Sequence, residues 1–429
     1  MKKNVTIILA SLLVAAGATS CSKMLEQYPH TAIQPEAVSV TDLPAVRMGM
    51  YNSVEEDPGT LSYLIFDIVG GDVNQKTYNP IDVINAELKT GSTMAAEWKG
   101  YYSALYQVNN VIFIANRFPD NPTAKLMLAE AYYFRAWLYL CLNTRFRGVP
   151  ILRENTEDYI LRSTEEQTWA FIDENIDNAL SLLGTSASYY YVSLDAAKAL
   201  KARICLYEGK KEEAARYAEE LITSGRYALD DFSDIFGTYP QPKTNTETIF
   251  AFRCDMETSS IRLGNEFYSY DYVNKGKGTY SVTEDIWKLY ESTDKRRNTS
   301  ILLDGGYYRL NKYPSGQAGT DPVIISRLGE MYLISAEAQG YPNGVARLNE
   351  LRSARGLEGA PVTNPDNFLE AILHERRLEL LGENQMYYDY VRTGTAVKYL
   401  GIKEFQTRFP IPDSEITLSR KTLEQNPGY

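Results

Sequence analysis

The chain has 429 residues, of which 44% are hydrophobic and 23% are charged, so it is long enough for one large domain or two to three smaller ones with a sizeable core. It contains 33 tyrosines but only two histidines, His30 and His374, which excludes a multi-histidine metal cluster and argues against a histidine-based catalytic triad. The net charge of −11 argues against a general nucleic-acid-binding protein, because such a protein needs a basic surface that displaces counterions.

The first twenty residues have the pattern of a bacterial export signal. Lys2 and Lys3 precede an apolar stretch, Val5–Ala16, which is too short to span a membrane as a mature helix. Cys21 directly follows a run of small residues, as in bacterial lipoproteins, whose thiol is acylated after cleavage. We therefore predict lipid attachment at Cys21; the alternative is a secreted protein with a coincidental cysteine. Loss of residues 1–20 removes two lysines and changes the net charge from −11 to −13.

The three remaining cysteines are predicted to form neither a disulfide framework nor a zinc site, and two of them to be buried thiols. Cys141, Cys205 and Cys254 are odd in number and widely spaced, which matches neither a disulfide framework nor a zinc site. Cys141 and Cys205 fall on the apolar faces of predicted helices, as do Trp98 and Trp137, so we expect these side chains in the core.

Helical periodicity dominates two parts of the chain. It predicts helices at residues 97–116, 123–144, 165–183 and 193–208. Ser193 and Asp195 are candidate helix-starting caps, and Gly209 and Gly225 are candidate left-handed residues that end two helices.

An internal repeat connects these parts. Residues 195–227 and 326–356 each read as a helix, a glycine-containing turn and a second helix, with small residues where the two helices would approach. This is typical of tetratricopeptide-type helix pairs, and residues 97–144 are predicted to add another pair. The alternative is a set of unrelated helical hairpins. We expect a mostly α fold, with a helical scaffold at about 93–227 and 326–400.

Two other segments have a different composition. Residues 57–92 and 228–325 are rich in Gly, Asn, Asp and Tyr, with short strand-like pieces such as Thr248–Arg253. Long irregular segments in a compact protein are usually binding loops or disordered, and the high aromatic content argues against disorder. We predict that these two segments form a variable, ligand-binding half of one domain spanning residues 21–429.

No catalytic motif is found in the sequence. The Gly-x-Ser-x-Gly elbow is absent, and Lys275–Thr279 has its glycines and lysines at the wrong spacing for a P-loop. Glu375, Glu379 and Glu383 recur every four residues, but the neighbouring arginines favour a charged structural helix over an active site. We therefore expect no enzyme activity and no cofactor; a glycosidase with two loop carboxylates is the alternative.

The loop-rich segments offer aromatic stacking surface instead. Tyr268, Tyr270 and Tyr272 alternate, which in an extended segment would place all three rings on one face. Aromatic faces beside amide groups suit sugar rings and also extended peptides, whereas some of these rings are expected only to pack loops onto the helices. The candidate ligand-binding residues are Asn74, Tyr78, Tyr268, Tyr270, Tyr272, Tyr280, Tyr307 and Tyr308.

An ordered series of motifs resembles the SusD/RagB family of outer-membrane nutrient-binding lipoproteins over nearly the whole mature chain. The residues that carry the resemblance are Cys21, Trp98 with Tyr101-Tyr102, Asn109-Asn110, Ala129-Glu130-Ala131 with Phe134-Arg135-Ala136, Phe146–Pro150, Ala336-Glu337-Ala338, Leu348–Arg352 with Arg355-Gly356-Leu357, Glu375–Leu380, Tyr388-Asp389 with Val391-Arg392, Ile411-Pro412 with Glu415-Ile416, and Gln425–Tyr429. The chain departs from the family pattern at Arg147, where a small uncharged residue usually makes a tight turn.

The resemblance implies four tetratricopeptide-type units packed against a loop-rich binding half. It implies a lipoprotein held in the outer membrane through Cys21, facing the cell exterior, that captures oligosaccharides without chemistry and passes them to a SusC-like TonB-dependent transporter. Peptide capture, as in the RagB-like branch, is the alternative. The acidic mature chain disfavours a heavily sulfated or uronate-rich polymer, unless a local patch such as Lys295–Arg297 reverses this.

Overall fold

The computed structural model describes residues 34–75, 93–186, 188–237, 245–254, 259–270, 275–420 and 422–429. Cys21, Tyr78 and Tyr272 therefore lie outside the described residues. The chain divides into two compact units, residues 1–42 and 43–429. The described part of the first unit holds two short 3-10 helices, η1 (Pro35–Ala37) and η2 (Val40–Asp42).

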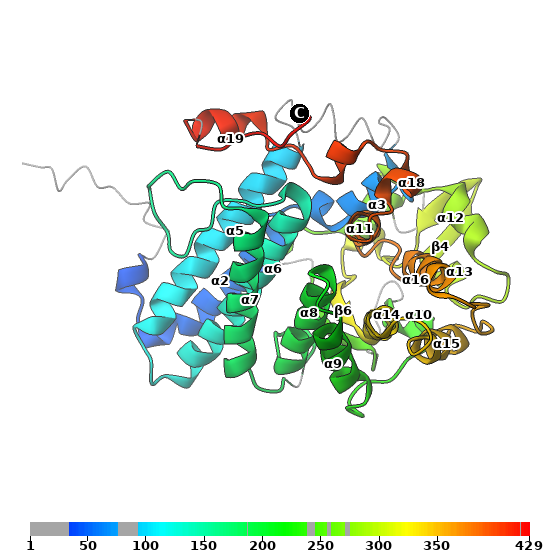
Figure 1. Cartoon of the computed structure of the whole chain (residues 1–429). Coiled ribbons are helices and arrows are strands. Elements are labelled where there is room, and N and C mark those ends of the chain that lie inside the picture. The colour runs from blue at the N-terminus through cyan, green and yellow to red at the C-terminus, as the bar shows by residue number, and fades with distance from the viewer. Residues whose placement is uncertain are drawn as a thin grey trace, which may run out of the picture. The chain divides into compact units, whose positions relative to one another are not determined.

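The helical scaffold of the second unit begins with long antiparallel helices (Figure 1). They are α2 (Leu43–Glu56), α5 (Thr93–Asn116), α6 (Pro122–Phe146), α7 (Glu165–Leu182), α8 (Leu194–Tyr207) and α9 (Lys211–Ile222). Helices α5, α6 and α7 pack consecutively, and α8 packs on α9. These bounds agree with the periodicity of the sequence to within a few residues.

Helix α6 lies at the centre of this scaffold and is buried around nearly its whole circumference. Asn121 caps it, since its side-chain oxygen accepts from the amides of Thr123 and Ala124. Phe134, which is fully buried, stacks with its ring 6.2 Å from Phe252. The hydrophobic core thus runs from α6 into the loop-rich half.

The C-terminal helices complete the scaffold. They are α14 (Leu328–Gln339), α15 (Val345–Ala354), α16 (Pro365–Glu379), α17 (Met386–Arg392), α18 (Ala396–Leu400) and α19 (Asp413–Leu418), with the 3-10 turn η6 (Glu404–Thr407). Helix α14 packs against α9, α15 and α16, and Leu333, Leu348, Leu351 and Ile372 are fully buried between them. The helix pairs predicted at 195–227 and 326–356 are therefore present and contact each other through α9 and α14.

Short elements make up the loop-rich half. They are η3 (Thr60–Tyr63), α3 (Ile65–Val69), β1 (Val73–Gln75), α10 (Phe232–Ile235), β2 (Thr248–Phe252), α11 (Leu263–Phe267), β3 (Tyr280–Val282), α12 (Glu284–Leu289), α13 (Arg297–Ser300), β4 (Ile301–Asp304), β5 (Tyr307–Leu310), η5 (Gly316–Ala318) and β6 (Val323–Arg327). The strands pair antiparallel as β1–β3, β2–β6 and β4–β5. Because β1 comes from residues 57–92 and β3 from residues 228–325, the two irregular segments meet.

Local turn chemistry follows the sequence closely. Ser193 caps α8 by accepting from the amide of Ala196, while Asp195 instead pairs with Arg226. Gly209 and Gly225 have φ of +77° and +69°, as predicted for residues that end helices.

The unusual Arg147 also adopts a left-handed conformation, with φ of +58°. Its guanidinium donates to Glu165 at 2.6 Å, so an ion pair to α7 holds this turn where most sequences would place a small residue.

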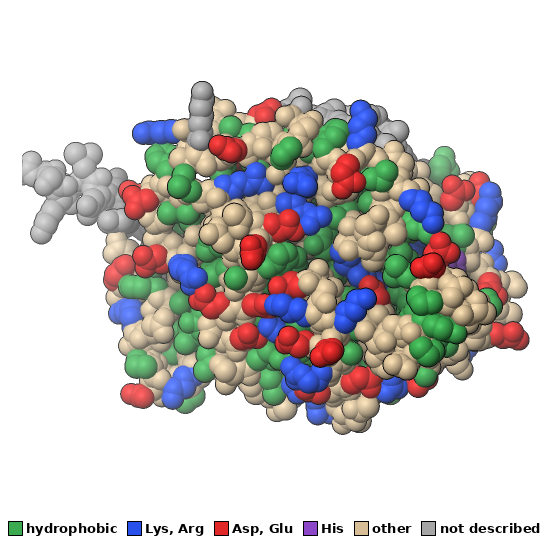
Figure 2. All heavy atoms as spheres, viewed as in Figure 1, with side chains coloured by type: hydrophobic (Ala, Val, Ile, Leu, Met, Phe, Trp, Pro, Cys, Tyr) green, Lys and Arg blue, Asp and Glu red, His purple; other side chains and the backbone are tan. Residues whose placement is uncertain are grey.

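Surface charge is mixed rather than segregated. On the face shown in Figure 2, acidic and basic side chains alternate over the helices, with hydrophobic patches between them. Among the described helices, none is long and apolar enough to cross a membrane. The described residues also contain no cluster of His, Cys, Asp and Glu side chains that could hold a metal ion.

Candidate ligand-binding surface

Three strands bring several of the predicted residues together. Strand β3 pairs with β1, so that Asn74 lies opposite Ser281 and Tyr280 lies opposite Gln75. On its other side β3 lies against β5, which carries Tyr307 and Tyr308. We call Asn74, Tyr280, Trp287, Tyr307 and Tyr308 the aromatic surface; it lies in the right-hand part of Figure 1, around α12 and β4.

The hairpin β4–β5 presents its two tyrosines on opposite faces, as neighbouring residues in a strand must. Tyr308 faces Trp287 of α12, with the ring centroids 5.9 Å apart. Tyr307 is 58% exposed and lies beside the guanidinium of Arg309, whose carbon is 5.7 Å from its ring centroid.

Arg309 also bonds the hairpin to α11. Its Nη1 donates to the carbonyl of Phe267 at 3.2 Å, and the Phe267 ring lies 6.1 Å from that of Tyr280 on β3. The two hairpin tyrosines thus lie on opposite faces, Tyr308 beside Trp287 and Tyr307 beside Arg309.

Buried ion pairs fix both ends of this hairpin to helix α16. Arg296, directly before α13, contacts Asp294 at 2.7 Å, Glu375 at 2.5 Å and Glu379 at 3.0 Å. Lys312, directly after β5, pairs with Glu383 at 2.6 Å. We call Arg296 and Lys312 the hairpin anchors. Because both side chains are 0% exposed, the hairpin is held rigidly while its tip projects outward.

Arginines surround the buried carboxylate of Glu379 on α16. Burial opposes ionisation of Glu379, but the guanidiniums of Arg355, Arg327 and Arg296 outweigh it and hold the pKa of this carboxyl well below its usual range. Burial also lowers the pKa of Lys312 to about 8, against the attraction of Glu383. The structural interpretation of Glu375, Glu379 and Glu383 agrees with this network, although their main partners are distant in sequence rather than adjacent.

Tyr268 was predicted to face the ligand, and this prediction is wrong. Its ring is only 1% exposed, and its hydroxyl donates to Oδ1 of Asn311 at 2.6 Å. The backbone N–H of Asn311 in turn donates to the carbonyl of Ser300, so Tyr268 supports the base of the hairpin. The alternation argument failed because Tyr268 ends helix α11 and packs inward, whereas Tyr270 is 74% exposed.

Tyr270 lies outside the aromatic surface as defined, on the turn that follows α11. The ammonium of Lys275 is 5.5 Å from its ring centroid. The backbone amide of Lys277 donates to the carbonyl of Asn265 at 2.7 Å, which keeps the two sides of this turn together. Tyr270 therefore remains a candidate contact beside the surface.

Sequence reasoning missed Trp287, and it named Arg297 only as part of the basic patch Lys295–Arg297. The guanidinium carbon of Arg297 lies 4.1 Å from the Trp287 ring centroid. The sequence does contain a signal for Trp287: Thr283 is a helix-capping residue, and Ile286 is an apolar residue one turn later. In the structure Thr283 caps α12 and Ile286 is buried, which places the next residue, Trp287, at the edge of the core.

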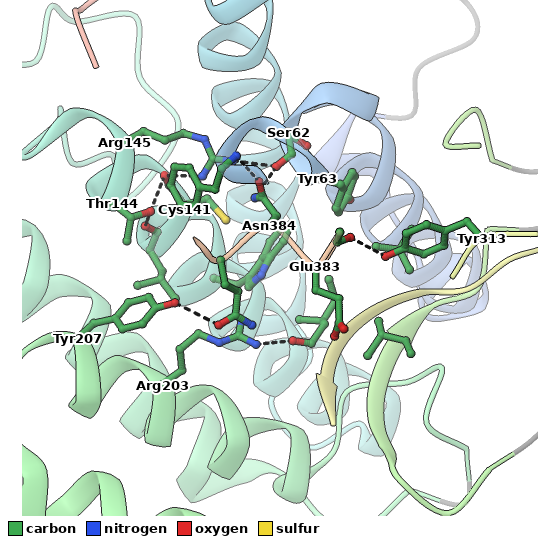
Figure 3. Close-up of a pocket in the computed structure, with 18 residues that line it drawn as sticks. Ser62, Tyr63, Cys141, Thr144, Arg145, Arg203, Tyr207, Tyr313, Glu383 and Asn384 are labelled. Atoms are coloured by element: carbon green, nitrogen blue, oxygen red, sulfur yellow. Dashed lines mark hydrogen bonds between the residues drawn. The ribbon is translucent and has the colours of Figure 1, made fainter. Parts of the chain in front are cut away.

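A cavity of about 70 Å³ lies inside the protein and is too small for a sugar. Side chains from α6, α8 and residues 382–385 point toward one another around it (Figure 3). Tyr207 donates to Gln385 at 3.5 Å, and Arg203 to the carbonyl of Ile325 at 2.5 Å. The volume suits about two water molecules, so we assign it no ligand.

Two larger hollows, of about 560 and 540 Å³, lie among α7, α8, α9, α14, α16 and α17. Their charged side chains are largely paired with each other: Lys210 with Asp173 and Glu208, and Arg392 with Glu337. The second hollow is lined by the rings of Trp169 and Tyr207, but neither hollow includes a strongly exposed ring such as that of Tyr307.

Comparison with known proteins identifies the family. A model described as the SusD family matches residues 268–407, and a second, described as starch-binding associating with outer membrane, matches residues 23–206. The chain belongs to the SusD/RagB family. A curated relative, SusD-like protein P38 of Formosa agariphila, is 25% identical over 93% of this chain and 93% of its own length.

Solved structures of SusD proteins share the fold. A SusD superfamily protein from Bacteroides thetaiotaomicron aligns with a TM-score of 0.79 at 23% identity, over 91% of this chain and 100% of that one. Surface glycan-binding protein A from the same organism, solved with laminarihexaose, aligns with a TM-score of 0.78 at 21% identity, over 91% and 100%. The mostly helical SusD-like fold predicted from the motifs is confirmed.

Proposed function

We propose that this SusD-family protein captures oligosaccharides on its aromatic surface and does no chemistry on them. The observation that carries the proposal is the anchored hairpin, which presents Tyr308 beside Trp287 on one face and the exposed Tyr307 on the other. Support also comes from relatives whose names describe binding of laminarin and laminarihexaose. The C–H faces of sugar rings stack on aromatic side chains while amides such as Asn74 bond hydroxyls.

The rigid hairpin suits binding more than catalysis. A surface held in its binding geometry loses little conformational entropy when a ligand arrives, which improves affinity. A glycosidase needs two available carboxyl groups, one of them protonated. Glu375 and Glu379 of α16, and Glu383 just after it, are instead buried and paired with arginine or lysine, so they cannot play this role.

The cellular role that we propose follows the family. Lipid on Cys21 would hold the protein in the outer membrane, facing the exterior, beside a SusC-like TonB-dependent transporter that receives the glycan. The name of the second family model, which mentions the outer membrane, supports this location. Weak capture suffices in such an arrangement, because a tethered binding protein raises the effective concentration of glycan at the transporter.

An affinity-gel screen of residues 22–429 against glycans tests the proposal. The double variant Tyr307→Ala/Tyr308→Ala should weaken retention about tenfold or more, since each lost stacking contact is worth about 1 kcal/mol. The matched control is Tyr106→Ala. The exposed fraction of Tyr106, 52%, is similar to the 58% of Tyr307, but Tyr106 lies on α5, away from the hairpin (Figure 1). Thermal unfolding should be nearly the same for all three proteins.

Three outcomes would contradict the proposal. Equal glycan retention by the double variant would move the site elsewhere. Binding of peptides but no glycan would favour the RagB-like alternative. Release of reducing sugar by the purified protein would show an enzyme.

A further inference from the structure

The exposed rings of Tyr270 and Tyr307 and the partly exposed ring of Trp287 each have a cation beside them. Lys275 lies over Tyr270, Arg309 over Tyr307 and Arg297 over Trp287, with distances to the ring centroids of 5.5, 5.7 and 4.1 Å. Cation–π contacts on protein surfaces are worth about 0.5–1 kcal/mol, too little to explain why three cations gather here in an acidic protein.

Arg297 differs from its neighbours in having no carboxylate partner among the described residues. The adjacent Arg296 contacts three acids, whereas no ion pair joins Arg297 to any described side chain. Its Nε is buried without a hydrogen-bond acceptor in the described structure. Because this Nε is enclosed, a ligand from solvent could approach only the outer nitrogens of the guanidinium, where an oxyanion would supply the missing charged partner.

The surroundings of Arg297 favour a sugar with a negative group. Trp287 and Tyr308 form an aromatic pair next to it, and the exposed Leu303 lies across the hairpin from Tyr308. Lys288, one residue after Trp287, adds a second cation, although it pairs with Glu284 at 3.0 Å. Rings for stacking thus lie beside an unpaired guanidinium.

We propose that the ligand of this surface is an acidic glycan whose anionic substituent, a carboxylate or a sulfate ester, binds Arg297 while its sugar ring stacks against the Tyr308–Trp287 pair. The inference rests on the proposed glycan capture and adds the substrate class. Arginine binds both kinds of oxyanion through two parallel N–H groups.

The acidic net charge of −11 does not oppose this assignment. Exposed charges farther away than about 8–10 Å are largely screened at physiological salt, so the groups next to the ligand decide. The expectation that the whole-chain charge disfavours uronate or sulfated polymers therefore does not apply at this surface. Within Lys295–Arg297, only Lys295 and Arg297 reach solvent, because Arg296 is fully buried.

Calorimetric titration with three probes tests the proposal: laminarihexaose as a neutral glycan, oligogalacturonate as a carboxylate and a carrageenan oligosaccharide as a sulfate ester. The variants are Arg297→Gln, which removes the charge, and Arg297→Lys, which keeps it without the two-pronged geometry. Arg153→Gln is the control, because Arg153 is an exposed arginine that pairs with Glu174 of α7.

The wild type should bind one acidic probe, and Arg297→Gln should weaken that binding about tenfold or more, with Arg297→Lys in between. Raising the salt from about 50 to about 500 mM should weaken the wild type and leave Arg297→Gln nearly unaffected. Which acidic probe binds distinguishes carboxylate from sulfate.

Other results separate the two proposals. Binding of laminarihexaose alone, unchanged in Arg297→Gln, would overturn the acidic-ligand inference and leave glycan capture standing. Equal weakening in Arg297→Gln and Arg153→Gln would also overturn it. Binding of none of the three probes, together with no retention in the broader glycan screen, would overturn glycan capture itself.

Discussion

Removal of the hairpin anchor Arg296 should destabilise the protein strongly. In Arg296→Met the side chain keeps a similar size but loses its charge, so the buried acids it contacts lose a partner. Glu379 retains Arg327 at 2.6 Å and Arg355 at 2.8 Å, and Glu375 retains Arg352 at 2.7 Å.

The main loss of stability in Arg296→Met should come from Asp294. Arg296 is its only ion-pair partner in the described structure, and its side chain is 0% exposed. Breaking a buried pair by removing one partner costs about 3–5 kcal/mol, because an uncompensated charge stays behind. We therefore expect the free energy of unfolding, measured by urea denaturation, to fall by about 4 kcal/mol.

Two further proteins make the test specific. Arg153→Met breaks an exposed pair with Glu174, with side chains 63% and 44% exposed, and should cost less than about 1 kcal/mol. Adding Asp294→Asn to Arg296→Met should restore at least about 1 kcal/mol, since the orphaned charge is gone. A loss below about 1 kcal/mol in Arg296→Met, or no recovery in the double variant, would refute the reasoning.

Three other predictions concern the scaffold. Burial raises the pKa of Asp67 to about 7, so between about pH 4 and pH 7 the folded protein holds a proton that the unfolded chain has released. The free energy of unfolding therefore falls as the pH rises through this range, by up to about 1.4 kcal/mol per pH unit. Asp67→Asn should flatten the dependence of the urea midpoint on pH, and an unchanged slope would contradict this. Gly100→Ala should lower the melting temperature markedly, because a Cβ there would collide with the backbone of Asp57, whereas Gly49→Ala, in open space on α2, should not. Cys205 is fully buried and burial raises the pKa of its thiol to about 12, so Ellman's reagent should not label it until urea unfolds the chain; rapid labelling of Cys205 at neutral pH would show an opening that the structure lacks.

The helical scaffold could be predicted from the sequence because its signals are local. The periodicity of residues 97–144, the cap at Ser193 and the helix-ending Gly209 act within one or two turns of chain. The repeated helix pairs were visible for the same reason, since small residues recur at the helix contacts.

The candidate site could be predicted only in part, because it depends on contacts between distant residues. Composition directed attention to the loop-rich segments, and Asn74, Tyr280 and Tyr307 lie on the neighbouring strands β1, β3 and β5, although the register places Asn74 and Tyr280 on opposite faces. Tyr268 was misplaced because its orientation is set by Asn311, 43 positions away. Arg297 was not singled out because nothing in the triplet Lys295–Arg297 tells a buried anchor from an unpaired neighbour.

The anchoring of the hairpin at its base has an evolutionary consequence. The residues that hold it, Arg296 and Lys312, bond to Glu375 and Glu379 of α16, whereas Gly305 and Gly306 lie at the opposite end of the hairpin, at its tip. Gly305 and Gly306 have open space around their Cα atoms, so substitutions near the tip meet little steric resistance from the scaffold, apart from the strain of a positive φ at these two positions. Lineages can therefore exchange tip side chains and acquire new ligands while the same folded protein is inherited.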